Sequence, residues 1–403
     1  MVVVQINLSC LWGSTGKICD SVSKLLSKKN IDNYVFYMYG GNPEQCHNYI
    51  QYTTYPYIKI QALKSRLMGN YGFNSLLSTK KLIKKLDEIK PDIVHVHNIH
   101  THDCNFEMLF EYLKEKNIKV FYTFHDCWTF TGYCPHFVMA KCENWQAGCG
   151  NCSSYKQYSW FFDKSAENCA RKRDALQRLD LTVITPSEWL AGLVKKSFLK
   201  DYPIKVINNG IDLSIFKPTE STFRQEHNLS DKKIVLGVST TWGNPKGLDM
   251  FLKLSEDLSE EYKIVLVGVD SETAARLPEN IISIHHTQNQ QELAAMYSAA
   301  DVFVNPTRED TFPTVNIESL ACGTPVVTFR TGGSPEILDD TCGSVVDCDD
   351  YEGLKREIIR ICRDNPYSAD ACVKRAKNYD KNEKYKEYLE LYEGIKVARS
   401  KRY

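Results

Sequence analysis

Two carboxylates, Asp310 and Glu318, stand eight positions apart around a predicted helix start. Residues 301–306 read as a short apolar strand, 307–313 as a polar loop and 314–322 as a helix. A carboxylate in such a loop, and a second one inside the helix, can accept hydrogen bonds from the hydroxyls of a sugar and a ribose. The spacing therefore predicts a site for a nucleotide that carries a sugar.

The first turn of the same helix adds a second component to this site. Thr314, Val315 and Asn316 contribute backbone amides that have no partner inside the helix, and the helix dipole adds positive partial charge there. Such helix starts attract phosphate groups. For this segment alone, an ordinary buried helix with a capped start is the alternative.

The loop CLWGSTGK near the N-terminus places Gly13 and Gly16 in a turn between a strand and a helix. The phosphate loop of nucleoside triphosphatases would require glycine at position 11 and serine or threonine at position 18, where this chain has Leu11 and Ile18. The glycines can instead let the backbone approach a pyrophosphate without side-chain obstruction. A simple tight turn is the alternative.

Strands and helices alternate along both halves of the chain, with short polar turns between them. This alternation predicts an α/β fold with two Rossmann-like domains, each a parallel sheet covered on both faces. The expected strands are VVVQINL, YVFYMY, DIVHVH, KVFYTF and LTVIT in the first half, and KIVLGV, KIVLVG, IISIH, DVFVN, PVVTF and GSVV in the second. Helices are expected in the first half near residues 15–29, 79–88, 106–116 and 187–199.

Each candidate residue follows a predicted strand. Ligands of open parallel sheets collect at the carboxyl ends of the strands. We therefore expect one cleft between the two domains, faced by Gly13, His97, His125, Lys246, Asp310 and Glu318.

Five segments resemble those of the retaining family 4 glycosyltransferases, enzymes of the GT-B fold. They are the carboxylate segment at 306–335, VINNGIDLSIFKP at 206–218, GVSTTWGNPKGLD at 237–249, PDIVHVHN at 91–98 and TFHDCWTFTG at 123–132. The last of these is most similar to bacterial exopolysaccharide transferases. The segments occur in family order over most of the chain, so the resemblance implies the GT-B arrangement of two domains around a cleft.

The resemblance also implies domain limits. The acceptor-side domain is expected over residues 1–206, with a cysteine-rich insert at 127–160, and the nucleotide-sugar domain over 207–380. In GT-B enzymes a terminal helix crosses back to the first domain, and residues 381–403 are expected to do so. The aromatic residues of this tail suit core contact: Tyr385, Tyr388 and Tyr392 recur at helical spacing with Leu389.

Roles for single residues follow from the same resemblance. Lys246 would place a positive charge on the diphosphate leaving group, where it stabilises the transition state more than the ground state. His125 would line the donor-sugar pocket and position a hydroxyl rather than act as a general base. His97 and Asn98, at a strand end, would line the acceptor side. In the implied front-face mechanism, the departing phosphate helps to deprotonate the acceptor hydroxyl.

The chain departs from the family pattern at two donor-binding positions. Many relatives have an arginine six residues before the phosphate lysine, where this chain has Thr240. The second cation is therefore expected from Arg308 or Lys17. Glutamate is usual at the first acidic position, where Asp310 follows Glu309, and either acid could reach the sugar.

Charge and length limit the possible partners. The 403 residues carry no net charge, but residues 1–205 hold 26 Lys and Arg against 18 Asp and Glu, a net +8, and residues 206–403 carry −8. A basic first half suits a lipid pyrophosphate or an anionic membrane surface, and a solvated charged face is the alternative. No nucleic-acid partner is expected. The chain has no run of eighteen apolar residues and starts with a strand-like segment, so we expect a cytoplasmic protein, peripheral on the inner membrane face.

Fifteen cysteines in a chain expected in the cytoplasm predict thiols rather than a disulfide framework. Cys134, Cys142, Cys149 and Cys152 lie close together in sequence and could hold a structural zinc ion tetrahedrally. Free thiols and a redox pair are the alternatives. Catalysis is expected to need no metal, and the Asp-x-Asp match at 347–349 is interpreted as chance.

We therefore expect a retaining glycosyltransferase that moves a hexose-type sugar from a nucleoside-diphosphate sugar to a bacterial surface glycan, such as a lipid-linked one. A GT-B phosphorylase and a nucleotide-sugar epimerase are alternatives among enzymes. A non-catalytic subunit that binds glycan or nucleotide sugar is the alternative from another class.

Overall fold

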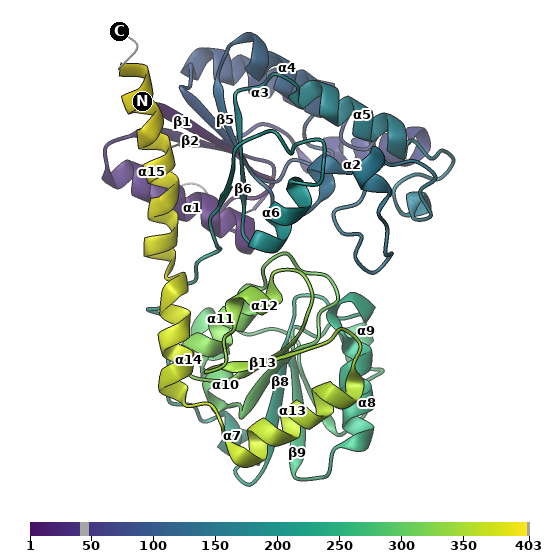
Figure 1. The fold of residues 1–403 in the computed structure, drawn as a ribbon, viewed down its shortest axis with the longest axis vertical. Helices are drawn as coiled ribbons and strands as arrows, with labels where there is room; N and C mark the ends of the chain where they lie inside the picture. The colour runs from purple at the N-terminus through teal and green to yellow at the C-terminus, as the bar shows by residue number, and fades with distance from the viewer. Residues whose placement is uncertain (41–47, 401–403) are drawn as a thin grey trace. The chain divides into compact units, whose positions relative to one another are not determined.

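The structure, a computed structural model, describes residues 1–40 and 48–400. Its contacts divide the chain into two units (Figure 1). Unit 1 comprises Met1–Asn208 and the chain from Lys384 onward, and unit 2 comprises Asn209–Glu383. Within the described residues, no helix combines the length and the apolar character that crossing a bilayer requires.

Unit 1 is built on a seven-stranded sheet with the order β3-β2-β1-β4-β5-β6-β7, in which neighbouring strands pair in parallel. Its strands are β1 (Val2–Ile6), β2 (Asp32–Tyr37), β3 (Tyr49–Gln51), β4 (Ile93–Val96), β5 (Lys119–Thr123), β6 (Leu181–Thr185) and β7 (Ile204–Val206). Its helices are α1 (Gly13–Lys28), α2 (Tyr55–Met68), α3 (Leu76–Ile89), α4 (Phe106–Glu115), α5 (Ser165–Leu176) and α6 (Glu188–Val194). Three short 3-10 turns lie in the insert: η2 (Trp128–Phe130), η3 (Asn144–Ala147) and η4 (Tyr155–Gln157).

Unit 2 has a six-stranded sheet with the order β10-β9-β8-β11-β12-β13, also parallel throughout. Its strands are β8 (Lys233–Val238), β9 (Tyr262–Val267), β10 (Ile281–Ile284), β11 (Val302–Asn305), β12 (Val326–Phe329) and β13 (Gly343–Val346). Its helices are α7 (Phe223–Glu226), η5 (Asn244–Lys246), α8 (Leu248–Asp257), α9 (Ser271–Ala274), α10 (Gln290–Ala299), α11 (Thr314–Ala321), α12 (Ser334–Ile337), α13 (Tyr351–Asp364), α14 (Ala369–Ala376) and η6 (Lys377–Tyr379). The predicted fold class, α/β with two Rossmann-like parallel sheets, is confirmed.

Each sheet is covered on both faces, which explains why the strands read as continuous apolar runs. In unit 1, Val4 and Ile6 of β1 join the core under α3 and α4, while Val3 points to the opposite core. That opposite core contains α1 and the terminal helix α15 (Lys381–Ser400). In unit 2 the same alternation divides β8 between two cores.

The terminal helix α15 contributes its aromatic stripe to unit 1. Tyr385, Tyr388 and Tyr392 are buried in the same core as the β1 residue Val3. The hydroxyl of Tyr392 hydrogen-bonds Nδ1 of His95, and Nε2 of His95 lies 2.8 Å from Oγ1 of Thr123. His95 is therefore a structural residue that joins the sheet to α15.

Helices α2 and α5 and strands β3 and β7 were not among the predicted elements. The case of α2 has a physical reason. Gln61 and Ser65 of this helix are buried together with Ile58, whereas Leu63 and Leu67 are exposed, so the leucines do not mark the buried face of the helix. A prediction that relies on apolar residues facing the core misses such a helix.

Candidate functional site

In unit 2 the predicted site residues centre on Lys246 and Asp310. Lys246 ends η5 after strand β8, and Asp310 lies in the loop after strand β11. The Nζ of Lys246 lies 2.8 Å from Oδ2 of Asp310, and both side chains are partly exposed. The other carboxylate oxygen of Asp310 accepts a hydrogen bond of 3.2 Å from the amide of Phe312. The ammonium and the carboxylate are thus held together at the carboxyl ends of neighbouring strands, where the sequence predicts ligand-binding groups.

The two loops that carry this pair are packed backbone to backbone. Gly247 adopts φ +71°, and a Cβ atom there would lie 2.4 Å from the carbonyl oxygen of Pro306. The amide of Arg308 donates a 2.9 Å hydrogen bond to the carbonyl of Pro245. Only glycine at position 247 permits this approach, which fixes the position of Lys246 relative to the loop after β11.

Arg308 is one of the two residues predicted to supply a second phosphate cation. Its guanidinium makes paired hydrogen bonds of 2.8 and 2.7 Å to Asp249, one of 2.7 Å to Asp349 and one of 2.8 Å to Oδ1 of Asn244. The hydrogen bond to Asp249 raises the pKa of Arg308 above its ordinary value, and the Arg308 side chain is only 9% exposed. Arg308 therefore holds the loops of unit 2 together. Lys17, the other residue predicted to supply this cation, is exposed on α1. The second phosphate cation stays a prediction.

A turn after β12 supports the Asp310 loop from the other side. Gly332 adopts φ +55°, and a Cβ atom there would lie 1.6 Å from the carbonyl oxygen of Asp310. The hydroxyl of Thr331 donates a 2.6 Å hydrogen bond to the carbonyl of Thr307. The glycine-rich turn thus acts by positioning Asp310.

Helix α11 carries the second carboxylate and the predicted amides. Glu318 accepts a 3.3 Å hydrogen bond from the hydroxyl of Tyr297, which is fully buried. Asn316 is also buried; its Oδ1 accepts a 2.8 Å hydrogen bond from Asn305, while its Nδ2 has no partner among the described residues. Thr314 and Val315, at the helix start, are half-buried. The amide of Asn316 donates a 3.1 Å hydrogen bond to the carbonyl of Pro313, so only Thr314 and Val315 of the predicted amides stay available at the helix start.

Two other predicted donor-binding residues lie in the same loops. Glu309 is half-buried beside Asp310, and Thr240 is exposed in the loop between β8 and η5. The structure thus brings Lys246, Asp310 and Glu309 into adjoining loops, while Thr240 offers no charge.

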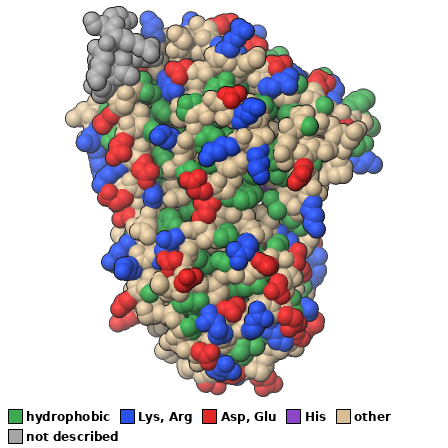
Figure 2. Space-filling model, in the orientation of Figure 1, with side chains coloured by type: hydrophobic (Ala, Val, Ile, Leu, Met, Phe, Trp, Pro, Cys, Tyr) green, Lys and Arg blue, Asp and Glu red, His purple; other side chains and the backbone are tan. Residues whose placement is uncertain are grey.

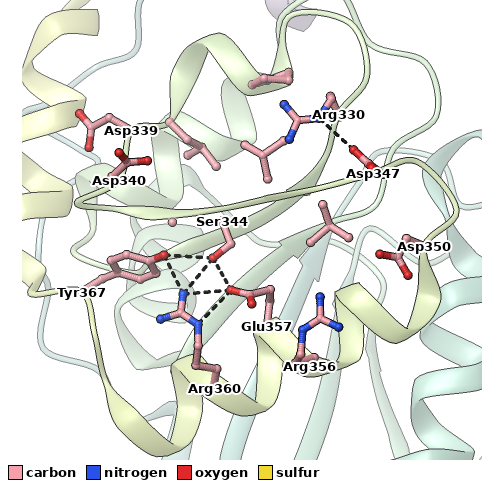
Figure 3. Close-up of a pocket in the computed structure, with 15 residues that line it drawn as sticks. Arg330, Asp339, Asp340, Ser344, Asp347, Asp350, Arg356, Glu357, Arg360 and Tyr367 are labelled. Carbon is pink, nitrogen blue, oxygen red and sulfur yellow. Dashed lines mark hydrogen bonds and ion pairs between the residues drawn. The ribbon is translucent and has the colours of Figure 1, made fainter.

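A separate hollow of about 740 Å³ runs along β13 and α13 (Figure 3). In it, Ser344 donates a 2.7 Å hydrogen bond to Glu357, and Arg360 donates one of 2.8 Å to Tyr367. None of the predicted site residues lines this hollow. It therefore belongs to a different part of unit 2.

In unit 1 the predicted site residues centre on two histidines. Nδ1 of His97, just after β4, lies 3.3 Å from Nε2 of His125, just after β5, and their rings stack at 17°. Burial lowers the pKa of His125 to about 4, although Asp126 opposes this effect, and burial holds the pKa of His97 well below its ordinary value. Both rings are therefore neutral near pH 7 and can form hydrogen bonds without carrying charge.

Sequence reasoning missed a neighbouring pair. Nε2 of His100 lies 2.8 Å from Oδ2 of Asp126, whose Oδ1 accepts a 2.8 Å hydrogen bond from the amide of Trp128. Burial opposes ionisation of Asp126, but His100 and these hydrogen bonds lower its pKa to about 2. The available signal was the position of Asp126 directly after His125 at the end of a predicted strand.

Two buried polar atoms in this cluster have no hydrogen-bond partner among the described residues, Nε2 of His97 and Oδ1 of Asn98. Buried polar atoms are nearly always paired, so each exception requires an explanation. The amide of Asn98 is paired, through a 3.3 Å hydrogen bond to Oδ1 of Asn7 in the loop after β1. That contact ties the ends of β1 and β4 together.

The glycine loop adjoins the same strand end. Gly13 adopts φ +69°, and no atom lies within 4 Å of the position that its Cβ would occupy. A Cβ at Gly16, in contrast, would lie 2.9 Å from the hydroxyl of Ser9. Gly16 is thus required for packing, whereas Gly13 leaves its backbone open to a ligand.

The four cysteines predicted to bind zinc line one cavity of about 20 Å³. Three of the four thiols are paired: Cys134 hydrogen-bonds Cys152, and Cys149 hydrogen-bonds Cys169, which the sequence did not implicate. The hydrogen bond from Cys134 lowers the pKa of Cys152 to about 7. Throughout the described part of the chain, no three His, Cys, Asp or Glu side chains are arranged to hold a metal ion. Zinc binding by the four cysteines stays a prediction.

Each unit matches a known family of glycosyltransferases. The model of glycosyltransferase family 4 matches residues 16–215, and that of glycosyl transferases group 1 matches residues 219–382. A GDP-mannose-dependent phosphatidylinositol monomannoside mannosyltransferase of Mycolicibacterium smegmatis is 29% identical over 216 residues, 48% of this chain and 56% of that protein. The curated relatives are thus matched over 36% to 56% of their own length.

Solved structures resemble the chain over nearly its whole length. The sucrose-phosphate synthase of Thermosynechococcus elongatus superposes with a TM-score of 0.70 at 16% identity, covering 98% of this chain and 99% of that one. Anabaena HepE in complex with UDP-glucose superposes with a TM-score of 0.70 at 15% identity, covering 98% and 100%. These likenesses show the shared GT-B fold. Together with the two family models, which cover both units, they establish that the chain belongs to the family 4 glycosyltransferases.

Proposed function

We propose that the protein is a retaining glycosyltransferase. It would move a hexose-type sugar from a nucleoside-diphosphate sugar to a hydroxyl of a bacterial surface glycan, such as a lipid-linked one, at the cytoplasmic face of the membrane. The observation that supports this most directly is the Lys246–Asp310 pair, held at 2.8 Å by loops that follow neighbouring strands. A cation and a carboxylate at the ends of parallel strands suit a diphosphate and a sugar hydroxyl.

The unit 2 groups have separate roles in this proposal. Lys246 and the amides of Thr314 and Val315 at the start of α11 neutralise the diphosphate, and they favour its departure because negative charge grows there in the transition state. Asp310, with Glu309 beside it, accepts hydrogen bonds from hydroxyls of the transferred sugar. Glu318 accepts them from the ribose, and Tyr297 keeps its carboxylate oriented.

The unit 1 groups bind and orient. A histidine with a pKa of about 4 is neutral at pH 7, so His125 serves as a hydrogen-bonding group for a sugar hydroxyl. The unpaired Nε2 of His97 and Oδ1 of Asn98 would receive acceptor hydroxyls. No described carboxylate is assigned as a nucleophile; the acceptor proton passes to the departing phosphate, and the configuration at the reacting carbon is retained.

One observation favours a second candidate function. Thr240 is uncharged, and Arg308 is bound to Asp249 and Asp349. Among the described residues of unit 2, Lys246 is therefore the one cation that we assign to the diphosphate, and a second one would have to come from Lys17 of unit 1. A subunit that binds a nucleotide sugar without transferring it would tolerate this arrangement better than an enzyme would.

Turnover on a donor panel separates the two functions. UDP- and GDP-sugars are both included, because the mannosyltransferase relative is named for GDP-mannose and HepE was solved with UDP-glucose. Lys246→Ala and Glu318→Gln should each reduce kcat/KM at least a hundredfold. Lys374→Ala, which changes an exposed lysine on α14, should leave it unchanged. Calorimetric binding of UDP or GDP with no sugar transfer or donor hydrolysis by the wild type would support the binding subunit instead.

A further inference from the structure

The exposed large hydrophobic side chains of the described residues all belong to unit 1. All but two of them lie on α2, at the start of α3 or at residues 160–162; the exceptions are Trp12 and Met139. The others are Tyr55, Ile60, Leu63, Leu67, Met68, Leu76, Leu77, Trp160, Phe161 and Phe162. We call these ten residues the apolar platform. Hydrophobic side chains are visible at the surface of unit 1 in the space-filling view (Figure 2).

Helix α2 has an apolar face that is exposed and polar residues that are buried. Ile60, Leu63 and Leu67, at helical spacing, are 54%, 50% and 40% exposed, whereas Gln61 and Ser65 on the opposite side are buried. The buried hydroxyl of Ser65 accepts a 2.8 Å hydrogen bond from Asn74. A surface helix normally turns its apolar stripe to the core. Because α2 turns leucines outward and satisfies buried polar groups inward, its outer face is built for an apolar partner.

Hydrogen bonds join the three segments of the apolar platform into one surface. The hydroxyl of Tyr57 on α2 accepts a 3.1 Å bond from the amide of Leu77 at the start of α3. The carbonyl of Arg66 accepts a 2.8 Å bond from the amide of Trp160. The exposed residues are therefore neighbours, and an exposed apolar area of this kind marks an interaction site.

The charge around the apolar platform is mostly positive. Residues 48–89 contain seven Lys and Arg against two acidic residues, Asp87 and Glu88 at the end of α3, and Asp163 follows Phe162. These cations are Lys59, Lys64, Arg66, Lys80, Lys81, Lys84 and Lys85. Lys59 and Lys64 are exposed on α2 itself, beside the leucines, and Lys80, Lys81 and Lys84 are exposed on α3. The platform is thus an apolar surface with cations around it.

We propose that the apolar platform docks the protein on the surface of an anionic lipid bilayer, with the leucines and aromatic rings in the interface and the lysines on the headgroups. Leucine, tryptophan and phenylalanine flanked by lysine are the composition of interfacial membrane helices. The same lysines could also form ion pairs with a protein partner that carries acidic residues. However, the leucines and aromatic rings of the platform are bordered mostly by lysines, and this composition suits an anionic lipid surface.

This inference names the membrane contact of the proposed function, and its test is independent of sugar transfer. An enzyme that acts on lipid-linked acceptors gains from residence at the bilayer. Vesicle binding and donor turnover are separate measurements, so either can fail while the other succeeds.

Cosedimentation of the full chain with vesicles tests the proposal. Vesicles of phosphatidylcholine with 30% phosphatidylglycerol should bind the protein at least tenfold more strongly than pure phosphatidylcholine, and raising the salt from 0.1 to 0.5 M should weaken this binding. The variant L63S/L67S and the variant K59E/K64E should each lower the partition coefficient on the anionic vesicles at least tenfold. Met139→Ser, an exposed apolar residue outside the platform, and Lys374→Glu on α14 serve as matched controls and should leave it unchanged.

A variant outside α2 tests the proposal even if the α2 variants do not fold. W160S/F161S changes only exposed residues outside helices and should reduce binding without lowering Tm. Subtracting the emission spectrum of Trp160→Phe from that of the wild type gives the emission of Trp160. This emission should shift to shorter wavelength when anionic vesicles are added. Absence of vesicle binding, or binding that all of these variants retain, would overturn the proposal. So would a dimer in solution that L63S/L67S abolishes, since a second copy would then cover the platform.

Discussion

The backbone of Gly332 lies so close to Asp310 that a Cβ atom at position 332 would sit 1.6 Å from the Asp310 carbonyl oxygen. Gly332→Ala must therefore displace the loop that carries Asp310, and its φ of +55° adds strain for alanine. We expect a loss of about 2–4 kcal/mol in the free energy of unfolding and a fall in transferase activity larger than the loss of folded protein. Urea unfolding and kcat/KM measure the two effects. Gly243→Ala, where φ is 175° and the nearest atom is 3.8 Å away, is the matched control and should change neither.

Arg308 is expected to act on stability. Arg308→Gln removes the partner of both Asp249 and Asp349 from a site that is 9% exposed, and should lower the free energy of unfolding by about 2 kcal/mol. Arg330→Gln is the control, because its ion pair with Asp347 is mostly exposed and should contribute little. Thermal unfolding of both variants checks the difference. An unchanged Tm in Arg308→Gln together with lost nucleotide binding would instead restore Arg308 as a phosphate ligand.

The neutral His125 makes stability depend on pH. Its pKa is lowered by burial from 6.5 to about 4, so between these values the unfolded chain binds a proton that the folded chain does not. The free energy of unfolding should therefore fall as pH falls below 6.5, by about 2 kcal/mol at pH 5 for this group. Urea titrations at pH 7.5 and pH 5 measure it.

A matched pair of variants isolates the contribution of His125. His125→Gln should show a smaller loss between pH 7.5 and pH 5, since no imidazole remains there to protonate. His286→Gln, which replaces an exposed histidine, should show the wild-type loss. An equal loss in all three proteins would mean that other groups cause the acid sensitivity.

Zinc binding can be measured by thiol protection. Without metal, iodoacetamide should modify Cys152 at pH 7.5 faster than Cys134, because the hydrogen bond from Cys134 lowers the pKa of Cys152 to about 7. If zinc binds as the sequence predicts, equimolar zinc should protect both, with Cys142 and Cys149, and leave the exposed Cys348 reactive. Peptide mass spectrometry reads each site. Unchanged alkylation at all sites in zinc, with no zinc found in freshly purified protein, would show the zinc prediction to be wrong.

Much of the fold could be predicted because a strand buried on both faces needs a continuous apolar run. The segments KVFYTF and KIVLGV, for example, became β5 and β8 within one residue of their expected limits. The positions of Lys246 and Asp310 after strands followed from the same reasoning, since parallel strands present their carboxyl ends at one edge of the sheet.

Other features depend on partners far apart in the chain. Arg308 hydrogen-bonds Asp249 and Asp349, and Cys149 hydrogen-bonds Cys169. Local sequence patterns do not predict these contacts, because the partners are far apart in the chain. The His100–Asp126 pair likewise joins the ends of two different strands.

The sequence by itself determined the two parallel sheets and the family of the chain, because strand periodicity and short motifs are local properties. Only the tertiary structure decided which charges are committed to ion pairs and which face of α2 is exposed. Both depend on what packs against a side chain, and in α2 the buried Gln61 and Ser65 leave the leucines on the outside.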